Sequence, residues 1–272
     1  MTYHSKHGAV QEAETVFIDA ALLHVLEWTI DDYAAEFCKN NFDKIEIDKI
    51  KFGKTKFLKN YLPPINLHIL EIGLGTGLNA LMTFLEIQKQ ANRKMTINLN
   101  YTAFEAFPPS RETISALNYV DIFAENPNTS YFFDTIHQTD WETPTNIDPD
   151  RNAIIDANRL ADIDFDIDIE IPSMLYCSIV FTKKMQEFQA LNEENCYDII
   201  YYDAFAPATQ PELWTIEVFE KMYRALRPNG VLTTYCAKGE VKRNLCAAGF
   251  RVESLPGPIG KREMTRAVKD LL

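Results

Sequence analysis

LHILEIGLGTGLN, the stretch from Leu67 to Asn79, decides the fold of this chain. Its first half is apolar, as expected for a strand of a parallel sheet that is buried on both faces. Glycines at positions 73, 75 and 77 follow, and an apolar pattern with helical spacing begins after them. Glycine permits the backbone angles of a tight turn, and the N–H groups at a helix start are free to bind a ligand. The stretch therefore predicts a strand, a glycine turn and a helix that form a ligand cradle.

The spacing of the glycines narrows the class of ligand. A dinucleotide fingerprint needs its third glycine where this chain has Leu78, and the Gly-Lys-Ser/Thr of nucleotide-triphosphate loops is absent. The negative charge of Glu71 disfavours a polyphosphate and favours a ligand with a cationic amino acid part. The pattern resembles motif I of class I S-adenosylmethionine (SAM) methyltransferases. The alternative is a glycine turn that only packs the helix on the strand.

Polar residues follow two further predicted strands. The strand at Ile97 to Phe104 ends in Glu105, whose carboxylate is positioned to accept hydrogen bonds from the ribose hydroxyls of an adenosine. Residues 131–141 predict a third strand, with Asp140 and Trp141 at its end to hold and stack on an adenine. A surface glutamate, a turn aspartate and a core tryptophan are the alternatives.

The second site-bearing segment begins at a strand predicted over Tyr197 to Tyr202. This strand delivers Asp203, Phe205 and Pro207 to its carboxyl end, where open α/β sheets bind their ligands. An aromatic ring and a carboxylate suit the methylation of an amine on a planar base, since the ring stacks and the carboxylate accepts the amine proton. His137 is a lone histidine in the sequence and receives no catalytic role.

The remaining segments extend the alternation of strands and helices. We expect helices over Ala21–Cys38, Ser110–Tyr119, Pro211–Leu226 and Val241–Ala248, and strands over Val231–Cys236, Phe250–Leu255 and Arg262–Val268. Carboxylates alternate with apolar side chains from Asp162 to Ile171, which predicts a half-buried strand with a solvated face; a paired-carboxylate metal site is the alternative. We divide the chain into an N-terminal extension with an inserted segment (1–60) and a methyltransferase domain (61–272) with an acidic insertion at 143–178.

Composition indicates a globular protein. The chain has 272 residues, of which 46% are hydrophobic and 24% charged. Its five cysteines include no C-x-x-C pair, so we expect reduced thiols and no metal site. No apolar signal core or membrane-spanning run is present, and we therefore expect a cytoplasmic protein without a membrane partner.

Charge is distributed unevenly along the chain. The formal net charge is −12, yet residues 221–272 carry eleven Lys and Arg against four Asp and Glu. Residues 121–175 carry thirteen Asp and Glu against two Arg, so much of the acidity lies in one segment. The basic C-terminal end is compatible with a polyanionic partner, although ordinary solvated surface explains both segments equally well.

Seven motifs together carry a more specific resemblance: YHSKHGAVQEAETVF, LEIGLGTGLNAL, YDAFAP, QPELW, LTTYCAKGEVKRNL, AAGF and GPIGKREM. They resemble the tRNA 5-(aminomethyl)uridine methyltransferase family, the methyltransferase half of the bifunctional enzyme MnmC. The resemblance covers residues 3–18, 67–141 and 180–268, and the regions near 24–60 and 143–178 look like insertions of open role.

The resemblance implies a class I α/β fold, with a Rossmann-like seven-stranded, mostly parallel sheet whose last strand is antiparallel. It implies SAM as the cofactor and, as the substrate, the 5-aminomethyl group of a wobble uridine in tRNA, often 2-thiolated, which becomes 5-methylaminomethyl. The flavin-dependent oxidase half has no counterpart in these motifs, so no FAD is expected and another enzyme has to supply the amine.

The resemblance also implies roles for individual residues. The cofactor is expected to contact Glu71, Gly73, Gly75, Thr76, Gly77, Asn79, Glu105, Asp140 and Trp141. Asp203 is expected to orient the amine or accept its proton, while Phe205 and Pro207 bound the uracil. The tRNA anticodon arm is expected to meet its phosphates at Lys238, Lys242, Arg243, Lys261 and Arg262.

Two other functions stay open. One is a SAM methyltransferase for a small amine or a protein side chain, which fits the acidic net charge. The other is a SAM-binding or RNA-binding module without catalysis. Methyl transfer into tRNA discriminates between them and the tRNA methyltransferase.

Overall fold

The computed structural model describes residues 6–41, 63–91, 96–148, 177–185 and 191–271. The domain boundary predicted near residue 60 and the strand predicted over Asp162 to Ile171 lie outside these ranges. Within them, the helices are too short or too polar to cross a membrane.

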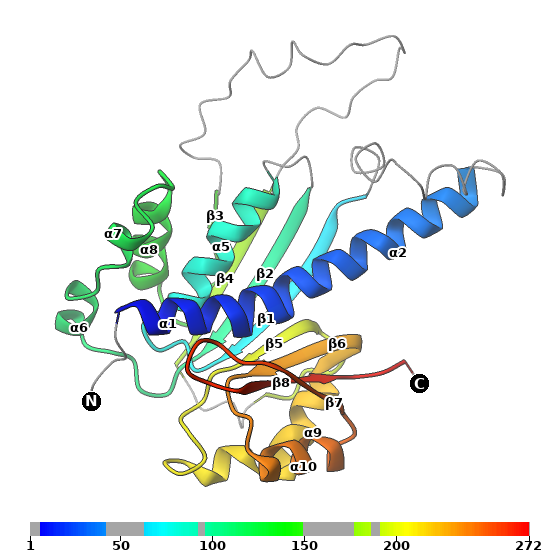
Figure 1. Ribbon diagram of the computed structural model, residues 1–272. Helices are drawn as coiled ribbons and strands as arrows, with labels where there is room; N and C mark the ends of the chain where they lie inside the picture. The colour runs from blue at the N-terminus through cyan, green and yellow to red at the C-terminus, as the bar shows by residue number, and fades with distance from the viewer. Residues whose placement is uncertain (1–5, 42–62, 92–95, 149–176, 186–190, 272) are drawn as a thin grey trace.

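One sheet organises the described residues (Figure 1), and its strands follow the order β3-β4-β2-β1-β5-β6-β8-β7. The strands are β1 (Ile65–Ile72), β2 (Ile97–Phe104), β3 (Thr145–Ile147), β4 (Cys177–Lys184), β5 (Tyr197–Tyr202), β6 (Leu226–Thr234), β7 (Arg251–Pro256) and β8 (Glu263–Val268). Strands β4, β2, β1, β5 and β6 are parallel, and β8 runs antiparallel between β6 and β7. The predicted class I sheet is confirmed, with the short β3 added antiparallel at one edge.

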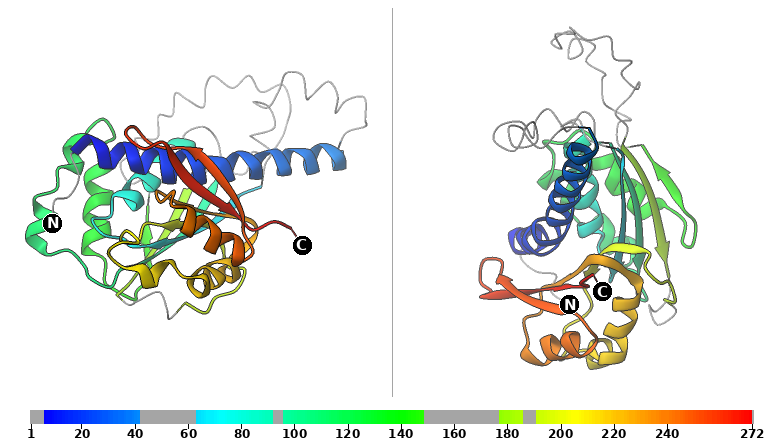
Figure 2. Two further views of the ribbon diagram at one scale, coloured as in Figure 1. Left: turned by 60° about the horizontal axis from the view of Figure 1, so that its bottom comes forward. Right: turned by 90° about the vertical axis from the view of Figure 1, so that its right-hand side faces the viewer.

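Helices cover both faces of the sheet (Figures 1 and 2). They are α1 (Lys6–Ala13), η1 (Glu14–Leu23), α2 (His24–Asn41), α5 (Leu78–Ala91), α6 (Arg111–Ser115), α7 (Tyr119–Ile122), α8 (Thr129–Gln138), η4 (Pro211–Trp214), α9 (Ile216–Ala225) and α10 (Gly239–Ala247). The helices η1, α5 and α8 share one apolar core with the sheet, and α9 and α10 share another. Strand β1 lies between the two cores because Leu67 and Ile69 face the first while Leu70 and Ile72 face the second.

The N-terminal helices pack directly on the sheet. The π-helical segment η1 contacts α5, β5 and β6, and its Phe17 ring lies 5.1 Å from the ring of Tyr201 on β5. Phe17, Ile18 and Leu22 are fully buried, and each contributes about 2 kcal/mol of hydrophobic stabilisation. The buried side chains between Ala13 and Leu22 are therefore part of the apolar core around the sheet.

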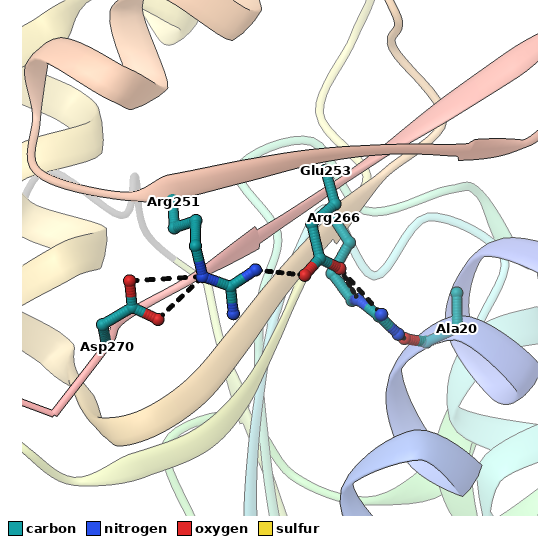
Figure 3. Close-up of polar contacts among 5 residues, drawn as sticks. All are labelled: Ala20, Arg251, Glu253, Arg266 and Asp270. Atoms are coloured by element: carbon teal, nitrogen blue, oxygen red, sulfur yellow. Dashed lines mark hydrogen bonds and ion pairs between the residues drawn. The ribbon is translucent and has the colours of Figure 1, made fainter.

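An ion-pair network fixes the β7–β8 hairpin to η1 (Figure 3). Arg266 on β8 donates to Glu253 Oε2 at 2.7 Å and to the carbonyl of Ala20 at 3.1 Å. Arg251 pairs with the other oxygen of Glu253 and donates to Asp270 at 2.9 Å. These contacts hold the β7–β8 hairpin against the N-terminal helices. The site described below includes residues from both segments.

The strand predicted over residues 131–141 is wrong. Residues 129–138 form helix α8, because Phe132 and Ile136 are four positions apart and bury one face against the first core. The parallel strand beside β2 is β4, which follows the acidic segment.

Three predicted helices also have different extents. The helix predicted over Ala21–Cys38 includes the end of η1 and most of α2, which continues to Asn41. Within residues 110–119 only Arg111–Ser115 is helical, as α6, before α7 begins at Tyr119. The segment from Pro211 divides into η4 and α9 at Thr215, which caps α9. Strands β2 and β5 have the predicted bounds, and the predicted pairing of the last two strands is confirmed.

Candidate active site

The glycine turn after β1 brings two other elements close. Gly73, Gly75 and Gly77 have φ angles of +92°, +51° and +75°, which favour glycine. A Cβ at Gly73 would lie 2.6 Å from the carbonyl oxygen of Asp203, and one at Gly77 would lie 2.9 Å from Ile136. At Gly75 the nearest atom to such a Cβ is 4.0 Å away. The turn thus packs against β5 and α8 on two sides and keeps its middle glycine open to a ligand.

Glu105 and Thr76 are both tied to this turn. Glu105 follows β2 and accepts hydrogen bonds from the N–H groups of Gly75, at 2.8 Å, and Phe107, at 2.7 Å. Each carboxylate oxygen keeps a further lone pair, as contact with ribose hydroxyls would require. Thr76 bonds instead to the hydroxyl of Tyr119 at 2.7 Å and so connects the turn to α7.

Asn79 links two carboxyl groups at the start of α5. Its side-chain nitrogen donates to Glu71 Oε1 at 2.9 Å and to Asp203 Oδ2 at 3.0 Å. The hydroxyl of Tyr101 donates to the other oxygen of Glu71 at 2.8 Å. Glu71 has 0% exposure, so its influence on a ligand passes through Asn79.

Burial raises the pKa of both carboxyl groups. Removal from water raises the pKa of Glu71 well above its usual value, against the lowering effect of the hydrogen bonds from Tyr101 and Asn79. Burial likewise raises the pKa of Asp203 to about 6, although Asn79 opposes this shift. With a pKa of about 6, Asp203 is mostly ionised at pH 7.

The loop after β5 presents an aromatic ring. Phe205 is 48% exposed, and its carbonyl accepts a hydrogen bond of 2.8 Å from the indole of Trp214. Pro207 borders a hollow of about 470 Å³ between this loop and the starts of α9 and α10. A fixed backbone with an exposed ring suits stacking on a planar base.

Three residues from distant segments meet beside Asp203. Lys261, in the loop between β7 and β8, pairs with Glu12 on α1 at 2.7 Å. Its ammonium also lies 4.6 Å from the ring centre of Tyr235, whose hydroxyl donates to the carbonyl of Ala204 at 2.9 Å. Sequence reasoning missed Glu12 and Tyr235, although both lie inside motifs quoted for the family resemblance.

The other predicted RNA-contacting cations have different surroundings. Lys242 donates to Glu263 at 2.8 Å and to Ser254 at 2.7 Å. Among the described residues, no carboxylate lies within 4.0 Å of the charged groups of Lys238, Arg243 or Arg262. These three side chains are the ones that remain available to phosphates.

Asp140 and Trp141 lie at the same edge of the sheet, but the element that precedes them is not the predicted strand. They follow helix α8, and Trp141 forms a parallel bridge with Lys183 near the end of β4. The Lys183 ammonium lies 4.8 Å from the centre of the Trp141 ring. The next residue of β4, Lys184, accepts a backbone hydrogen bond from Glu105, so Trp141 lies one strand beyond Glu105.

His137 lies against the glycine turn, where sequence reasoning gave it no role. A Cβ at Gly77 would be 3.5 Å from its ring, and its buried Nε2 has no hydrogen-bond partner among the described residues. Burial, with the nearby cation of Lys183, lowers the pKa of His137 to about 4. The imidazole is therefore neutral at pH 7.

The geometry fits the amino acid and nucleoside parts of SAM. The open middle glycine, the fixed Glu105 carboxylate and the Asn79 amide all lie at the carboxyl edge of β1, β2 and β5. In the described part of the chain, no group of three His, Cys, Asp or Glu side chains is arranged to hold a metal ion.

Comparisons with known proteins agree with this interpretation. A family model described as S-adenosyl-L-methionine-dependent methyltransferase matches residues 160–270. The tRNA 5-methylaminomethyl-2-thiouridine biosynthesis bifunctional protein MnmC of Aeromonas hydrophila is 28% identical over 197 residues, which cover 71% of this chain and 26% of that protein. The MnmC protein of Aeromonas salmonicida is 28% identical over 191 residues. The chain thus spans about a quarter of the length of these relatives.

Among solved structures, MNMC2 from Aquifex aeolicus matches with a TM-score of 0.46 and 18% identity, over 80% of this chain and 57% of that one. The sheet order, the glycine turn and the matches in sequence lead to one assignment. The chain has the fold of the class I S-adenosyl-L-methionine-dependent methyltransferases, and its sequence is similar to about a quarter of the length of the MnmC proteins.

Proposed function

We propose that this enzyme methylates the 5-aminomethyl group of a wobble uridine in tRNA, giving 5-methylaminomethyl-uridine. The observation that carries the proposal is the pairing of Asp203, held by Asn79, with the exposed ring of Phe205 at the end of β5. A carboxylate beside an aromatic surface suits an amine attached to a planar base. The name of the MnmC relatives, which refers to tRNA 5-methylaminomethyl-2-thiouridine biosynthesis, supports the same substrate.

The glycine turn and Glu105 are the proposed cofactor contacts, with Asp140 and Trp141 proposed for the adenine. When bound, SAM supplies a methyl group on a sulfonium sulfur, which a neutral amine takes up as the carbon–sulfur bond breaks and one amine proton is released. Thr76 and Asn79 fix the turn and the start of α5 through their hydrogen bonds to Tyr119 and Glu71. The cradle is thus held in one geometry before a ligand binds.

Asp203 acts on the amine. Asn79 engages Oδ2, and Oδ1, which has no hydrogen-bond partner among the described residues, is proposed to accept a hydrogen bond from the substrate N–H. With a pKa of about 6, the carboxylate is ionised at neutral pH and can orient the amine or receive its proton. Phe205 stacks on the uracil, which is exposed in the single-stranded anticodon loop. Pro207 limits the position of the anticodon loop.

Phosphates of the anticodon arm are proposed to bind Lys238, Arg243 and Arg262. Lys242 and Lys261, which the family resemblance also assigns to RNA, form ion pairs with Glu263 and Glu12. These two would have to exchange a carboxylate for a phosphate. The amine itself has to come from a separate reaction that uncovers the aminomethyl group.

Transfer of a labelled methyl group tests the proposal. Labelled SAM is incubated with total tRNA from cells that lack the modification, with wild type and with the Asp203→Ala variant. Label in wobble uridine with wild type only is the expected result. Label in small amines or protein alone would favour the rival methyltransferase, and SAM binding without any transfer would favour a non-catalytic module.

A further inference from the structure

The ammonium of Lys261 lies in a small cationic subsite. Glu12 Oε1 is 2.7 Å from Lys261 Nζ, and the centre of the Tyr235 ring is 4.6 Å from it. The three residues come from α1, from the segment after β6 and from the β7–β8 loop, with 249 positions between Glu12 and Lys261. A carboxylate and an aromatic face together form an environment that recognises a primary alkylammonium group.

This subsite adjoins the candidate catalytic carboxylate. The hydroxyl of Tyr235 donates to the carbonyl of Ala204, the residue after Asp203, at 2.9 Å. Glu12 raises the pKa of Asp203 and Lys261 lowers it, so both charges act on this carboxyl group. The three side chains and Asp203 therefore form one electrostatic unit.

The proposed substrate carries the same chemical group as Lys261. A 5-aminomethyl group ends in a primary amine on a CH₂, as a lysine side chain does. We propose that Glu12 and Tyr235 form the binding subsite for the substrate's primary alkylamine, and that Lys261 leaves this subsite when the amine binds. The inference rests on the proposed function and adds to it the residues that recognise the amine.

Exchange of the two amines is physically simple. Lys261 has a flexible side chain that is 40% exposed, and exposed ion pairs contribute little to stability. Two like charges cannot both lie between Glu12 and Tyr235, so binding of the substrate amine excludes the Lys261 ammonium. The bound ammonium has to give up one proton before its nitrogen can take the methyl group, and Asp203, which is ionised at neutral pH, is the proposed acceptor of that proton.

The Lys261→Met variant distinguishes this subsite from a role of Lys261 in phosphate binding, because the two roles predict opposite effects on tRNA binding. If Lys261 binds RNA phosphate, the Lys261→Met variant binds every tRNA more weakly. If Lys261 competes with the substrate amine, this variant binds aminomethyl-tRNA at least as tightly as wild type does. The comparison therefore uses one tRNA in two forms, with 5-aminomethyluridine or with unmodified uridine at the wobble position.

The experiment measures the Kd of both tRNAs, the Kd of SAM, and kcat and KM for methyl transfer. For the Glu12→Gln variant we expect the KM for aminomethyl-tRNA to rise about tenfold or more, and the preference for aminomethyl-tRNA over unmodified tRNA to disappear. The Kd of SAM should stay unchanged, which also shows that the variant is folded. The Glu220→Gln variant, at an exposed position on α9, is the matched control and should behave as wild type.

The outcomes separate the two proposals. Wild type that transfers no methyl group to aminomethyl-tRNA refutes the proposed function and this subsite with it. Wild type that transfers the methyl group, with an unchanged tRNA preference in Glu12→Gln, refutes the subsite alone. If Glu12→Gln fails to bind SAM, Lys261→Met decides: a KM for aminomethyl-tRNA at or below that of wild type supports the subsite, and a raised KM overturns it.

Discussion

The side-chain amide of Asn79 donates a hydrogen bond of 3.0 Å to the carboxylate of Asp203, across 124 positions of sequence. The same nitrogen donates to Glu71, which is fully buried and held in turn by Tyr101. The orientation of Asp203 thus depends on a buried carboxyl group that itself has no access to substrate. Asn79 is the positioning residue between them.

Replacing Asn79 by alanine should lower kcat for methyl transfer by about 10- to 100-fold, because Asp203 loses its fixed orientation. The free energy of unfolding should fall by about 1–3 kcal/mol, since one oxygen of the buried Glu71 loses its donor. Single-turnover kinetics and thermal unfolding measure the two effects. Asn98→Ala, at a side chain whose hydrogen bond to Asn66 is exposed, is the control. A kcat equal to that of wild type would contradict the positioning role.

The acid limb of the pH–rate profile should report Asp203. Because its pKa is about 6 and the carboxylate is the active form in the proposed reaction, kcat/KM should fall as the pH drops below about 6. The hydrogen bond from Asn79 lowers this pKa, so the Asn79→Ala variant should move the limb to higher pH. Titration of the substrate amine would also reduce the rate in acid, but its limb would stay in place when Asn79 is changed.

The raised pKa of Asp203 has a consequence for stability. Between its usual pKa of 3.8 and about 6, the folded chain keeps a proton that the unfolded chain has lost, so this group lowers the free energy of unfolding as the pH rises through that window. Asp203→Asn should therefore stabilise the fold at pH 7, by at most about 3 kcal/mol, while it removes activity. Urea unfolding at pH 4 and pH 7 tests this, since the gain should vanish at pH 4. The exposed Asp121→Asn variant should gain nothing at either pH.

Much of the sheet could be predicted because its central strands are short apolar runs that end in turn residues. Strand β1 is followed directly by Gly73, and β5 is followed directly by Asp203. Strand β4 was not predicted. Residues 131–133 are aromatic and favour a strand by composition, so the sequence pattern placed the third strand at residues 131–141 instead. The helical spacing of Phe132 and Ile136 is the signal for α8 that the strand prediction overlooked.

The parts of the site that directly follow a strand could be predicted from the sequence. The glycine turn, Glu105 and Asp203 each follow a strand, so their meeting at one edge follows from the parallel topology. Glu12, Tyr235 and Lys261 meet through the packing of α1 and the β7–β8 hairpin on the sheet, which local patterns do not encode. The Asn79 link between two carboxyl groups likewise depends on the close approach of β5 to the turn at Gly73.

Gly75 should be required for cofactor binding more than for folding. Its φ of +51° lies in the left-handed region that an alanine can adopt at a cost of about 1 kcal/mol, and a Cβ there meets no atom closer than 4.0 Å. The methyl group would instead occupy the space next to the main chain that the ligand needs. Gly75→Ala should raise the Kd of SAM at least tenfold with a small loss of thermal stability.

Gly260→Ala is the matched control for Gly75. Gly260 also has a positive φ, +90°, with no atom within 4 Å of a Cβ, but it lies in the β7–β8 loop and is not part of the glycine turn. Its variant should lose some stability and bind SAM as wild type does. Equal loss of SAM affinity in the two variants would show that backbone strain, rather than the position of the methyl group, is responsible.

Salt should weaken tRNA binding far more than SAM binding, because only tRNA binding releases counterions from phosphates. Arg243→Ala and Arg262→Ala should each reduce the slope of log Kd for tRNA against log salt concentration by about one. Both side chains lack a carboxylate within 4.0 Å among the described residues, so they are free to take a phosphate. Lys242→Ala should change the slope less, since Lys242 already pairs with Glu263 at 2.8 Å. Fluorescence anisotropy with labelled tRNA between 50 and 200 mM salt gives the slopes. If all three variants keep the wild-type slope, the phosphates bind elsewhere on the surface.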